Sequence, residues 1–385
     1  MKKLKIVVIG GGSSYTPELV EGIIKKQESL PVGEIVLVDI LEGEEKIKIN
    51  EGLVKRMFAH ANLDTKIYAS LDRRKALQGA DFIMTQFRVG GLKARKLDEE
   101  IPLKYGMIGQ ETTGIGGFFK ALRTIPVMME LCKEIEEICP DAWLINFTNP
   151  SGIITEVVST RTKVKSIGLC NVPINMVYEA ASLLGAEAQE VHCNFIGLNH
   201  LSFMNRCVYH GKDVLAQILD QAVQNSQEVD EEDQAEGTEK VEKAGLVKNI
   251  NKISEADSLA KRLGFMLSPY LQYFYFENVM LAEEKENVRS GKGTRAEQVM
   301  RVEKDLFALY QKADLDRKPI ELTKRGGSRY SEAAISLIDS IYNDRGDLQV
   351  VNTLNRGSIT NLPELASVEV NCIINRHGAS PVANG

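Results

Sequence analysis

Long apolar runs are missing from this sequence of 385 residues. The apolar run in the N-terminal segment MKKLKIVVIGGG is only about five residues long, whereas the apolar region of a signal peptide has roughly 7–15. No later stretch approaches the roughly 18 apolar residues that a membrane helix requires. The sequence therefore predicts neither a secreted nor a membrane protein.

Cysteine is scarce, and positive charge is not in excess. The six cysteines are scattered without a CxxC pair, so we expect reduced thiols in a cytoplasmic protein rather than a disulfide framework. The 47 Lys and Arg residues face 53 Asp and Glu residues, giving a net charge of −6, and no long basic run occurs. Nucleic acid and anionic membranes are therefore poor partners, and a small anionic substrate would need a local basic pocket.

Hydrophobic patterning divides the chain into two halves. From Lys5 to about Leu169, short β-branched runs alternate with longer helical patterns, which is typical of βαβ units and a parallel sheet. The six runs are KIVVIG, EIVLVD, KIYAS, DFIMTQ, AWLINF and SIGLC. We expect an α/β protein with a doubly wound Rossmann domain over residues 1–170, followed by an α+β, mostly helical second domain over residues 171–385.

The second half contains fewer strand patterns. VHCNFIGLNH and SFMNRCVYHG indicate two strands, and an acidic stretch at 225–243 indicates a solvated helix or loop. DLQVVNTL and SVEVNCIINR indicate two late strands, which we expect to form a small sheet. TRAEQVMRVEKDLFALYQKA predicts a helix with one core-facing side. Its apolar residues at helical spacing are Val299, Val302, Leu306, Leu309 and Tyr310.

The first predicted strand ends in three glycines and leads into a helix at TPELVEGIIKKQ, with Thr16 as N-cap and Pro17 at the first helical position. This arrangement predicts backbone N–H groups and a helix N-terminus that face a dinucleotide pyrophosphate. Tyr15 occupies the third glycine position of GxGxxG, so the motif is imperfect. The expected cofactor contacts in this loop are Gly10, Gly12, Ser13 and Ser14.

The second predicted strand ends in Asp39. A carboxylate at this place accepts hydrogen bonds from a ribose 2′-hydroxyl and would repel a 2′-phosphate. The sequence therefore predicts NAD rather than NADP.

Two metal-ligating residue types follow neighbouring strand patterns. Cys170 ends GLC after the sixth strand, and His200 ends GLNH after the seventh. Because ligands collect at the carboxyl ends of parallel strands, both side chains could face the nicotinamide and bind a divalent metal. From these residues alone, a buried Cys170 and a structural His200 explain the pattern equally well.

Eight segments, in order along the chain, resemble family 4 of the glycoside hydrolases and, within it, the 6-phospho-β-glucosidases. They are KIVVIGGGSSYTPELV, FRVGG, GQETTGIGG, LINFTNPSG, GLCNVP, GLNHLS, LSPYLQYFY and NRHGASP. This family is an exception to the usual two-carboxylate glycosidase scheme. Its members usually continue for several dozen residues beyond the equivalent of Gly385, so we expect a C-terminal helical portion to be absent from this chain.

The resemblance implies hydrolysis of 6-phospho-β-glucosides, such as cellobiose 6-phosphate, to glucose 6-phosphate. In the family, NAD oxidises the C3 hydroxyl of the sugar, a base removes the acidified C2 proton, the C1 substituent is eliminated, and water and hydride then return. It also implies that Cys170 and His200 hold a divalent metal, normally Mn2+, which takes O2 and O3 of the sugar. Ligand softness alone would have favoured zinc or iron.

The resemblance assigns further site residues. Tyr270 is the implied catalytic base, although a free phenol has a pKa of about 10, and Glu111 is implied to act near the metal. For Tyr270 the residues alone also allow a place in an aromatic core helix, and for Glu111 a solvated loop. Arg88 and Arg295 are expected to bind the phosphate or sugar hydroxyls. Asn149 is expected to bind substrate or the nicotinamide ribose.

Asn171, which follows Cys170, is also assigned to the substrate. In the α-specific relatives an aspartate typically stands at this position and is thought to protonate the leaving oxygen, so the amide favours β-glucosides. A 6-phospho-α-glucosidase, a metal-free NAD-dependent hydroxy-acid dehydrogenase and a non-catalytic NAD sensor stay as alternatives. The combination of Cys170, His200, Glu111 and Tyr270 disfavours the sensor. We expect a homo-oligomer, either a dimer or a tetramer.

Overall fold

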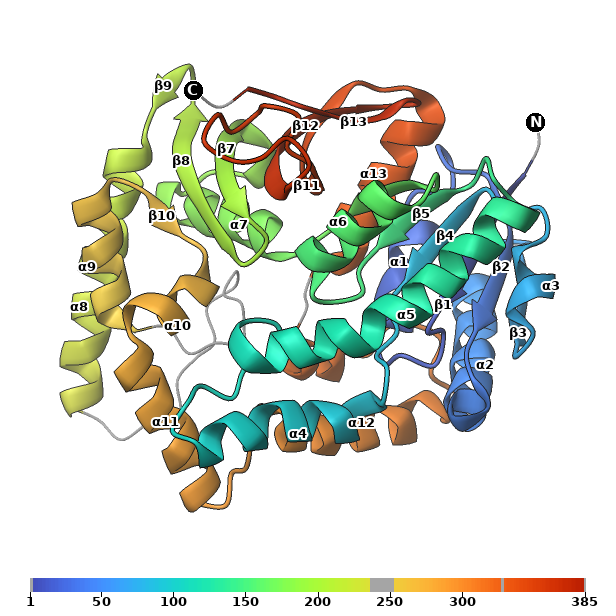
Figure 1. The fold of residues 1–385 in the computed structure, drawn as a ribbon, viewed down its shortest axis with the longest axis horizontal. Coiled ribbons are helices and arrows are strands. Elements are labelled where there is room, and N and C mark those ends of the chain that lie inside the picture. Colours follow the sequence, from blue (N-terminus) through green and yellow to red (C-terminus); the bar gives the residue numbers. More distant parts are fainter. Residues whose placement is uncertain (1–2, 236–252, 327–328, 384–385) are drawn as a thin grey trace.

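The computed structural model describes residues 3–235, 253–326 and 329–383 of the chain. Two sheets form its framework, one of nine strands and one smaller, with helices packed around them (Figure 1). Across the described ranges, no helix is long and apolar enough to span a bilayer.

The first six strands form the parallel part of the large sheet, as predicted. Their spatial order is β6-β5-β4-β1-β2-β3, which is the strand order of a Rossmann fold. The strands are β1 (Leu4–Ile9), β2 (Val32–Val38), β3 (Lys66–Ser70), β4 (Phe82–Thr85), β5 (Trp143–Asn146) and β6 (Lys165–Gly168). Each of the six sequence runs therefore forms a strand, and the predicted fold class is confirmed.

The large sheet buries both of its faces because side chains alternate along each strand. Ile6 and Val8 of β1 belong to a core with helices on one face, whereas Val7 and Ile9 pack into a second core on the other. The first core is shared with α1 (Thr16–Lys25), α2 (Glu44–His60), α12 (Arg295–Tyr310) and α13 (Tyr330–Asn343), and the second with α3 (Arg73–Leu77), α5 (Gly114–Ile138) and α6 (Ser151–Arg161).

The predicted amphipathic helix is α12. Val299, Leu306 and Tyr310 are buried, and Val302 and Leu309 pack against the same core. The expectation that these residues are core residues is confirmed.

The late strands do not form a separate sheet, and that expectation was wrong. β11 (Asp347–Leu354), β12 (Ser367–Asn375) and β13 (Gly378–Pro381) extend the Rossmann sheet beyond β6, all antiparallel to their neighbours. The open edge of β6 offers unpaired backbone groups, and β11 covers it at the pair Asn352 and Gly168. Strands from both sides of residue 170 thus belong to one sheet. The domain division at residue 170 stays a prediction.

The second sheet has the order β10-β8-β7, and β9 pairs with β8. Its strands are β7 (Val191–Leu198), β8 (Leu201–Tyr209), β9 (Lys212–Asp213) and β10 (Met266–Leu267). β7 and β8 form the two strands predicted after Cys170. The helices of this half, besides α12 and α13, are α7 (Val172–Leu184), α8 (Leu215–Ala235), α9 (Ser254–Leu263), α10 (Gln272–Tyr275) and α11 (Glu277–Arg289).

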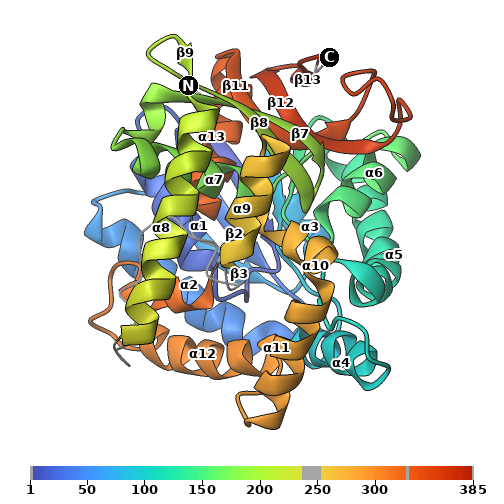
Figure 2. The ribbon, with the colours of Figure 1, turned by 90° about the vertical axis from the view of Figure 1, so that its left-hand side faces the viewer.

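The acidic stretch at 225–243 is a helix, the C-terminal part of α8, as far as Ala235. Its remaining part lies outside the described residues. Figure 2 views the molecule from the end at which α8, α9 and α11 lie, so these helices are in front and α5 and α6 are at the right.

Candidate active site

Two cavities meet at the carboxyl edge of the parallel strands. The larger, of about 1700 Å³, is lined by the glycine loop after β1 and by Asp39. The smaller, of about 180 Å³, is lined by Cys170, His200 and Tyr270. Both are bordered by Tyr15, Arg88, Asn149, Arg325 and Tyr330. A group bound in one cavity is therefore close to the other.

The glycine loop is built for close backbone approach. Gly10 has φ +87°, and a Cβ there would lie 2.8 Å from the backbone of Phe87. A Cβ at Gly12 would lie 2.7 Å from the Asp39 carboxylate. The loop thus requires glycine at both positions, which fits the dinucleotide motif.

The helix after this loop begins at Thr16, and Tyr15 rather than Thr16 is its N-cap. The N-cap prediction was wrong by one residue because the Thr16 hydroxyl donates to Gly11 O at 2.9 Å instead of capping the helix. Pro17 lies in the first turn as predicted. Tyr15, at the imperfect motif position, stacks on Tyr330 with ring centroids 5.9 Å apart.

Several N–H groups of the loop donate within the protein. Gly10 and Gly11 donate to Val38 O at 2.8 and 2.9 Å, and Ser13 donates to Gly10 O at 3.0 Å. These groups do not point outward as the sequence suggested, because those of Gly10 and Gly11 fasten the loop to β2 and that of Ser13 closes a turn within the loop. A pyrophosphate would instead meet the N-terminus of α1. Ser13 and Ser14 line the large cavity, but Ser14 is almost fully buried.

Asp39 follows β2 and lines the large cavity, as predicted. Its Oδ2 accepts from Gly12 N at 2.7 Å, and its Oδ1 accepts from Ile40 N at 2.9 Å. Gly43 also approaches this carboxylate, since a Cβ there would lie 2.6 Å from Oδ1. Backbone contacts thus fix the carboxylate at the place where a ribose would meet it.

Cys170 and His200 reach the small cavity from different sheets. Cys170 follows β6 of the large sheet, whereas His200 lies in the tight turn between β7 and β8 of the small one. His200 has φ +65°, a left-handed conformation that non-glycine residues adopt only at a cost. Both residues are buried.

The pKa of His200 is lowered to about 3, first by burial and then by the positive charge of Lys120. The imidazole is therefore neutral at neutral pH, which is the form that binds metals. Burial raises the pKa of the Cys170 thiol well above its usual range, and the negative charge of Glu369 adds to this effect. A metal would have to displace this proton, as metals do when they bind cysteine.

In the part of the chain that the structure describes, no three His, Cys, Asp or Glu side chains are grouped so as to hold a metal ion. Cys170 and His200 fit a two-ligand site whose remaining positions would be filled by substrate oxygens or water. Such an open site is typical of catalytic rather than structural metals.

Tyr270 lies against His200. The two rings are stacked with centroids 3.6 Å apart and planes 4° apart. Tyr270 lies in the 3-10 turn Pro269–Leu271 and not in an aromatic helix, because α10 begins only at Gln272. Burial raises the pKa of the Tyr270 phenol above 10, whereas the positive charge of Arg95 works in the opposite direction.

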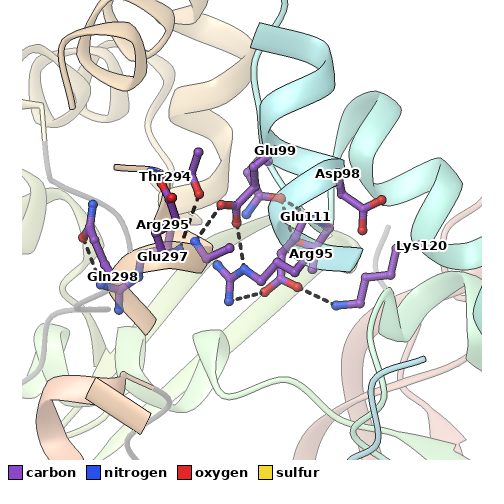
Figure 3. A network of polar contacts seen from close by, with 12 residues as sticks. Arg95, Asp98, Glu99, Glu111, Lys120, Thr294, Arg295, Glu297 and Gln298 are labelled. Atoms are coloured by element: carbon purple, nitrogen blue, oxygen red, sulfur yellow. Dashed lines mark hydrogen bonds and ion pairs between the residues drawn. The ribbon is translucent and has the colours of Figure 1, made fainter. Parts of the chain in front are cut away.

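Glu111 is surrounded by three cations. Arg88 forms an ion pair with it, Arg95 Nη1 lies 2.9 Å from its Oε1, and Lys120 Nζ lies 2.8 Å from its Oε2. Figure 3 shows Arg95 and Lys120 approaching the carboxylate from different helices. Despite burial, Arg88 and the other two cations hold the pKa of Glu111 well below its usual range. Glu111 is therefore ionised and cannot serve as a proton donor near neutrality.

Lys120 itself has a perturbed pKa. Burial, followed by repulsion from Arg88, lowers the pKa of its ammonium to about 7. Neither Lys120 nor Arg95 was predicted from the sequence. Their place depends on how α5 and α4 (Gly91–Lys104) cross, which no local pattern encodes.

Arg95 also joins this cluster to α12. Its Nε lies 2.7 Å from Glu99 Oε1, and Glu99 Oε2 accepts from Ala296 N at 2.7 Å (Figure 3). Arg295 stands next to Ala296 at the first turn of α12. Burial and then the charges of Arg95 and Arg325 lower the pKa of Arg295. Arg295 thus lies close enough to Arg95 and Arg325 to be repelled by their charges, and all three line the small cavity.

The remaining predicted residues also line the small cavity. Asn149 precedes Pro150 in a cis peptide bond, and its Oδ1 accepts from Ser151 N at 3.3 Å. Asn171 is the N-cap of α7 and is buried. The structure thus places Arg88, Glu111, Asn149, Cys170, Asn171, His200, Tyr270 and Arg295 around one cavity.

Comparison with known proteins identifies the class. The model of the family 4 glycosyl hydrolases matches residues 5–186, and the model of its C-terminal domain matches residues 195–385. The chain therefore belongs to glycosyl hydrolase family 4. It is a glycosidase rather than a hydroxy-acid dehydrogenase.

Individual relatives narrow the resemblance. A probable 6-phospho-beta-glucosidase from Bacillus subtilis is 49% identical over 385 residues, covering 100% of this chain and 83% of the relative. A 6-phospho-beta-glucosidase from Escherichia coli is 44% identical and covers 99% of this chain and 81% of the relative. A 6-phospho-beta glucosidase from Thermotoga maritima, solved with manganese, NAD+ and glucose-6-phosphate, is similar in structure. It has a TM-score of 0.84 at 38% identity, covering 99% of this chain and 84% of that chain.

Proposed function

We propose that the protein hydrolyses 6-phospho-β-glucosides with the help of NAD and a divalent metal. The observation that carries the proposal is the junction of the two cavities. A dinucleotide loop opens into one, and a Cys-His pair and four guanidinium groups line the other. The relatives of 44–49% identity that carry this activity in their names support it.

The phosphate of the substrate would lie beside Arg295 and Arg325. Burial is the largest cause of the lowered pKa of Arg295, and repulsion from Arg95 and Arg325 adds to it. A phosphate dianion would relieve this repulsion and accept paired N–H bonds from an arginine fork. Arg88 and Arg95 are less suited to this role because Glu111 binds both guanidinium groups and Glu99 also binds that of Arg95.

The cofactors fit the residues present. Gly10 and Gly12 leave room for a pyrophosphate at the start of α1, and Asp39 stands where a ribose 2′-hydroxyl would bind. Cys170 and neutral His200 would hold the metal, for which we propose Mn2+. When bound, NAD would accept a hydride from C3 of the sugar, and the metal would act as a Lewis acid toward its oxygens.

The side chains then have distinct tasks. Tyr270, fixed against His200, would take the proton from C2 of the sugar once the charges of a bound metal and Arg95 lower the raised pKa of its phenol. Glu111 would hold Arg88, Arg95 and Lys120 in place and offset their charges. Asn149 would bind the substrate or the nicotinamide ribose at the border of both cavities.

The test is an assay with p-nitrophenyl β-glucoside 6-phosphate. Turnover should require both NAD and Mn2+, with NAD acting catalytically and NADP unable to replace it because Asp39 repels the 2′-phosphate. The unphosphorylated glucoside should react at least about 10²-fold more slowly, since charged hydrogen bonds to phosphate contribute about 1.5–3 kcal/mol each. Hydrolysis without NAD, or an equal rate with the unphosphorylated glucoside, would contradict the proposal.

We also propose a cytoplasmic homo-oligomer. All six cysteines are buried free thiols, which fits a reducing compartment. The contacting helices α4 and α5 expose a group of large apolar side chains, which is typical of subunit interfaces. The group comprises Leu97, Ile101, Tyr105, Phe118, Phe119 and Leu122, each at least 44% exposed.

A charge placed in this group should prevent assembly. Phe118 is 58% exposed, so Phe118→Asp should leave the fold intact while destabilising a subunit contact there. Light scattering should give the mass of a dimer or tetramer for the unmodified chain and of a single chain for the variant. A single-chain mass for the unmodified protein would refute the oligomer.

A further inference from the structure

Glu369 is a buried carboxylate that the proposed chemistry does not use. It lies in β12 and is 1% exposed. Its Oε1 accepts from Asn199 Nδ2 at 2.9 Å and from Asn352 Nδ2 at 3.4 Å, and its Oε2 accepts from Ser202 Oγ at 2.7 Å. All three of these donors are neutral, so the carboxylate is desolvated at a cost that these bonds must offset.

The donors come from the two places that supply Cys170 and His200. Asn199 precedes His200 in the β7–β8 turn, and Ser202 lies two residues after His200, in β8. Asn352 lies in β11 opposite Gly168, two residues before Cys170. Glu369 therefore connects the turn that carries one proposed metal ligand to the strand beside the other.

Asn199 strengthens this link. It donates to Glu369, and its side chain also hydrogen-bonds toward the Cys170 sulfur, which works to lower the pKa of that thiol. The Asn199 amide thus contacts both the Glu369 carboxylate and Cys170, one of the two proposed metal ligands. His200, the other proposed ligand, directly follows Asn199 in the chain.

The conformation of His200 explains why such a connection is needed. Its φ of +65° is unfavourable for a non-glycine residue, so the surroundings must hold it. The bonds that Glu369 accepts from Asn199, just before His200, and from Ser202, two residues after it, supply that restraint. A carboxylate suits the task because it only accepts, and its two oxygens satisfy three converging donors, whereas a glutamine would bring one oxygen and an extra NH2.

A second residue of β12, Asn371, joins this strand to β7 of the small sheet. Asn371, two positions along the same face, accepts from Phe195 N at 2.7 Å and donates to Cys193 O at 2.9 Å. It fastens the edge of β7 far from the turn. Both residues join β12 to the small sheet, but Glu369 alone of the two reaches the turn.

We propose that Glu369 is a positioning residue that sets the relative placement of Cys170 and His200, and thereby the affinity of the site for Mn2+. The inference rests on the proposed metal site. Partners that orient metal ligands typically change affinity by 10- to 100-fold when they are replaced.

The experiment measures Mn2+ binding to the full chain by electron paramagnetic resonance of the free ion, with NAD binding by calorimetry as a second readout. Glu369→Gln should weaken Mn2+ binding by about 10- to 100-fold. NAD affinity should stay unchanged, and kcat should recover at saturating Mn2+. The matched control is Asn371→Ser, which removes a docking contact from the same strand face. It should lower Tm but change Mn2+ affinity less than about threefold.

Each outcome decides a different point. Unchanged Mn2+ affinity in Glu369→Gln, or an equal loss in Asn371→Ser, overturns the positioning role while the metal site stands. Failure of the unmodified protein to bind Mn2+ overturns the metal site and this role together. If Glu369→Gln does not fold, Ser202→Ala removes only one bond to the carboxylate, and unchanged Mn2+ affinity in that variant also overturns the proposal.

Discussion

Replacing His200 with alanine should abolish Mn2+ binding and lower kcat/KM by about 10³-fold or more. The imidazole is neutral because burial depresses its pKa to about 3, and it is fixed by its stack on Tyr270 and by its turn. A metal acting as a Lewis acid contributes several kcal/mol, and each 1.36 kcal/mol is tenfold in rate. With Cys170 as the one remaining ligand, the protein has no means of holding the ion in place.

The controls separate a metal effect from a general one. His192 lies in the same strand, β7, and is exposed, so His192→Ala should bind Mn2+ and turn over like the unmodified enzyme. NAD binding should persist in His200→Ala, because the glycine loop and Asp39 belong to the other cavity. Normal Mn2+ affinity in His200→Ala would remove His200 from the ligand set.

The alternating strands and helices of the first half were predictable from the sequence, because each element has its own local pattern. Each of the strands β1 to β6 is a short apolar run bounded by turns, and the parallel pattern follows from the helices between them. Asp39 was found because its place depends only on the end of the second strand. The cavity-lining position of Cys170 follows from the same rule, whereas His200 reaches the cavity from the turn of the antiparallel hairpin β7–β8, which the rule does not cover.

Features that depend on long-range pairing were not predictable. β11 and β12 were predicted as strands, but nothing in their residues shows that β11 pairs with the edge of β6. The two strands were therefore wrongly expected to form a separate sheet. The cations around Glu111 come from α4 and α5, and their meeting is set by helix packing. Glu369 reads as one polar residue in a late strand, and only the folded chain brings it to the turn of His200.

The enzyme should cleave cellobiose 6-phosphate and leave maltose 6-phosphate almost untouched, because Asn171 stands where an acid would assist an α-linked leaving group. Asn171 is the buried N-cap of α7, directly after Cys170, and it lines the small cavity. An amide cannot donate a proton at neutral pH, whereas general acids contribute about 10²- to 10⁴-fold. We expect the rate difference between the two disaccharide phosphates to fall in this range.

Substitutions at this position separate proton donation from pocket shape as the source of the preference. Asp and Ser are both good N-caps, so Asn171→Asp and Asn171→Ser should leave α7 intact. Only the aspartate offers an acid, so Asn171→Asp should raise the rate on maltose 6-phosphate while Asn171→Ser should not. The substrates must be disaccharides, because an activated aryl leaving group needs no acid and would hide the difference. A gain in both variants would show that the shape of the pocket selects the anomer, and faster cleavage of maltose 6-phosphate by the unmodified enzyme would overturn the β assignment itself.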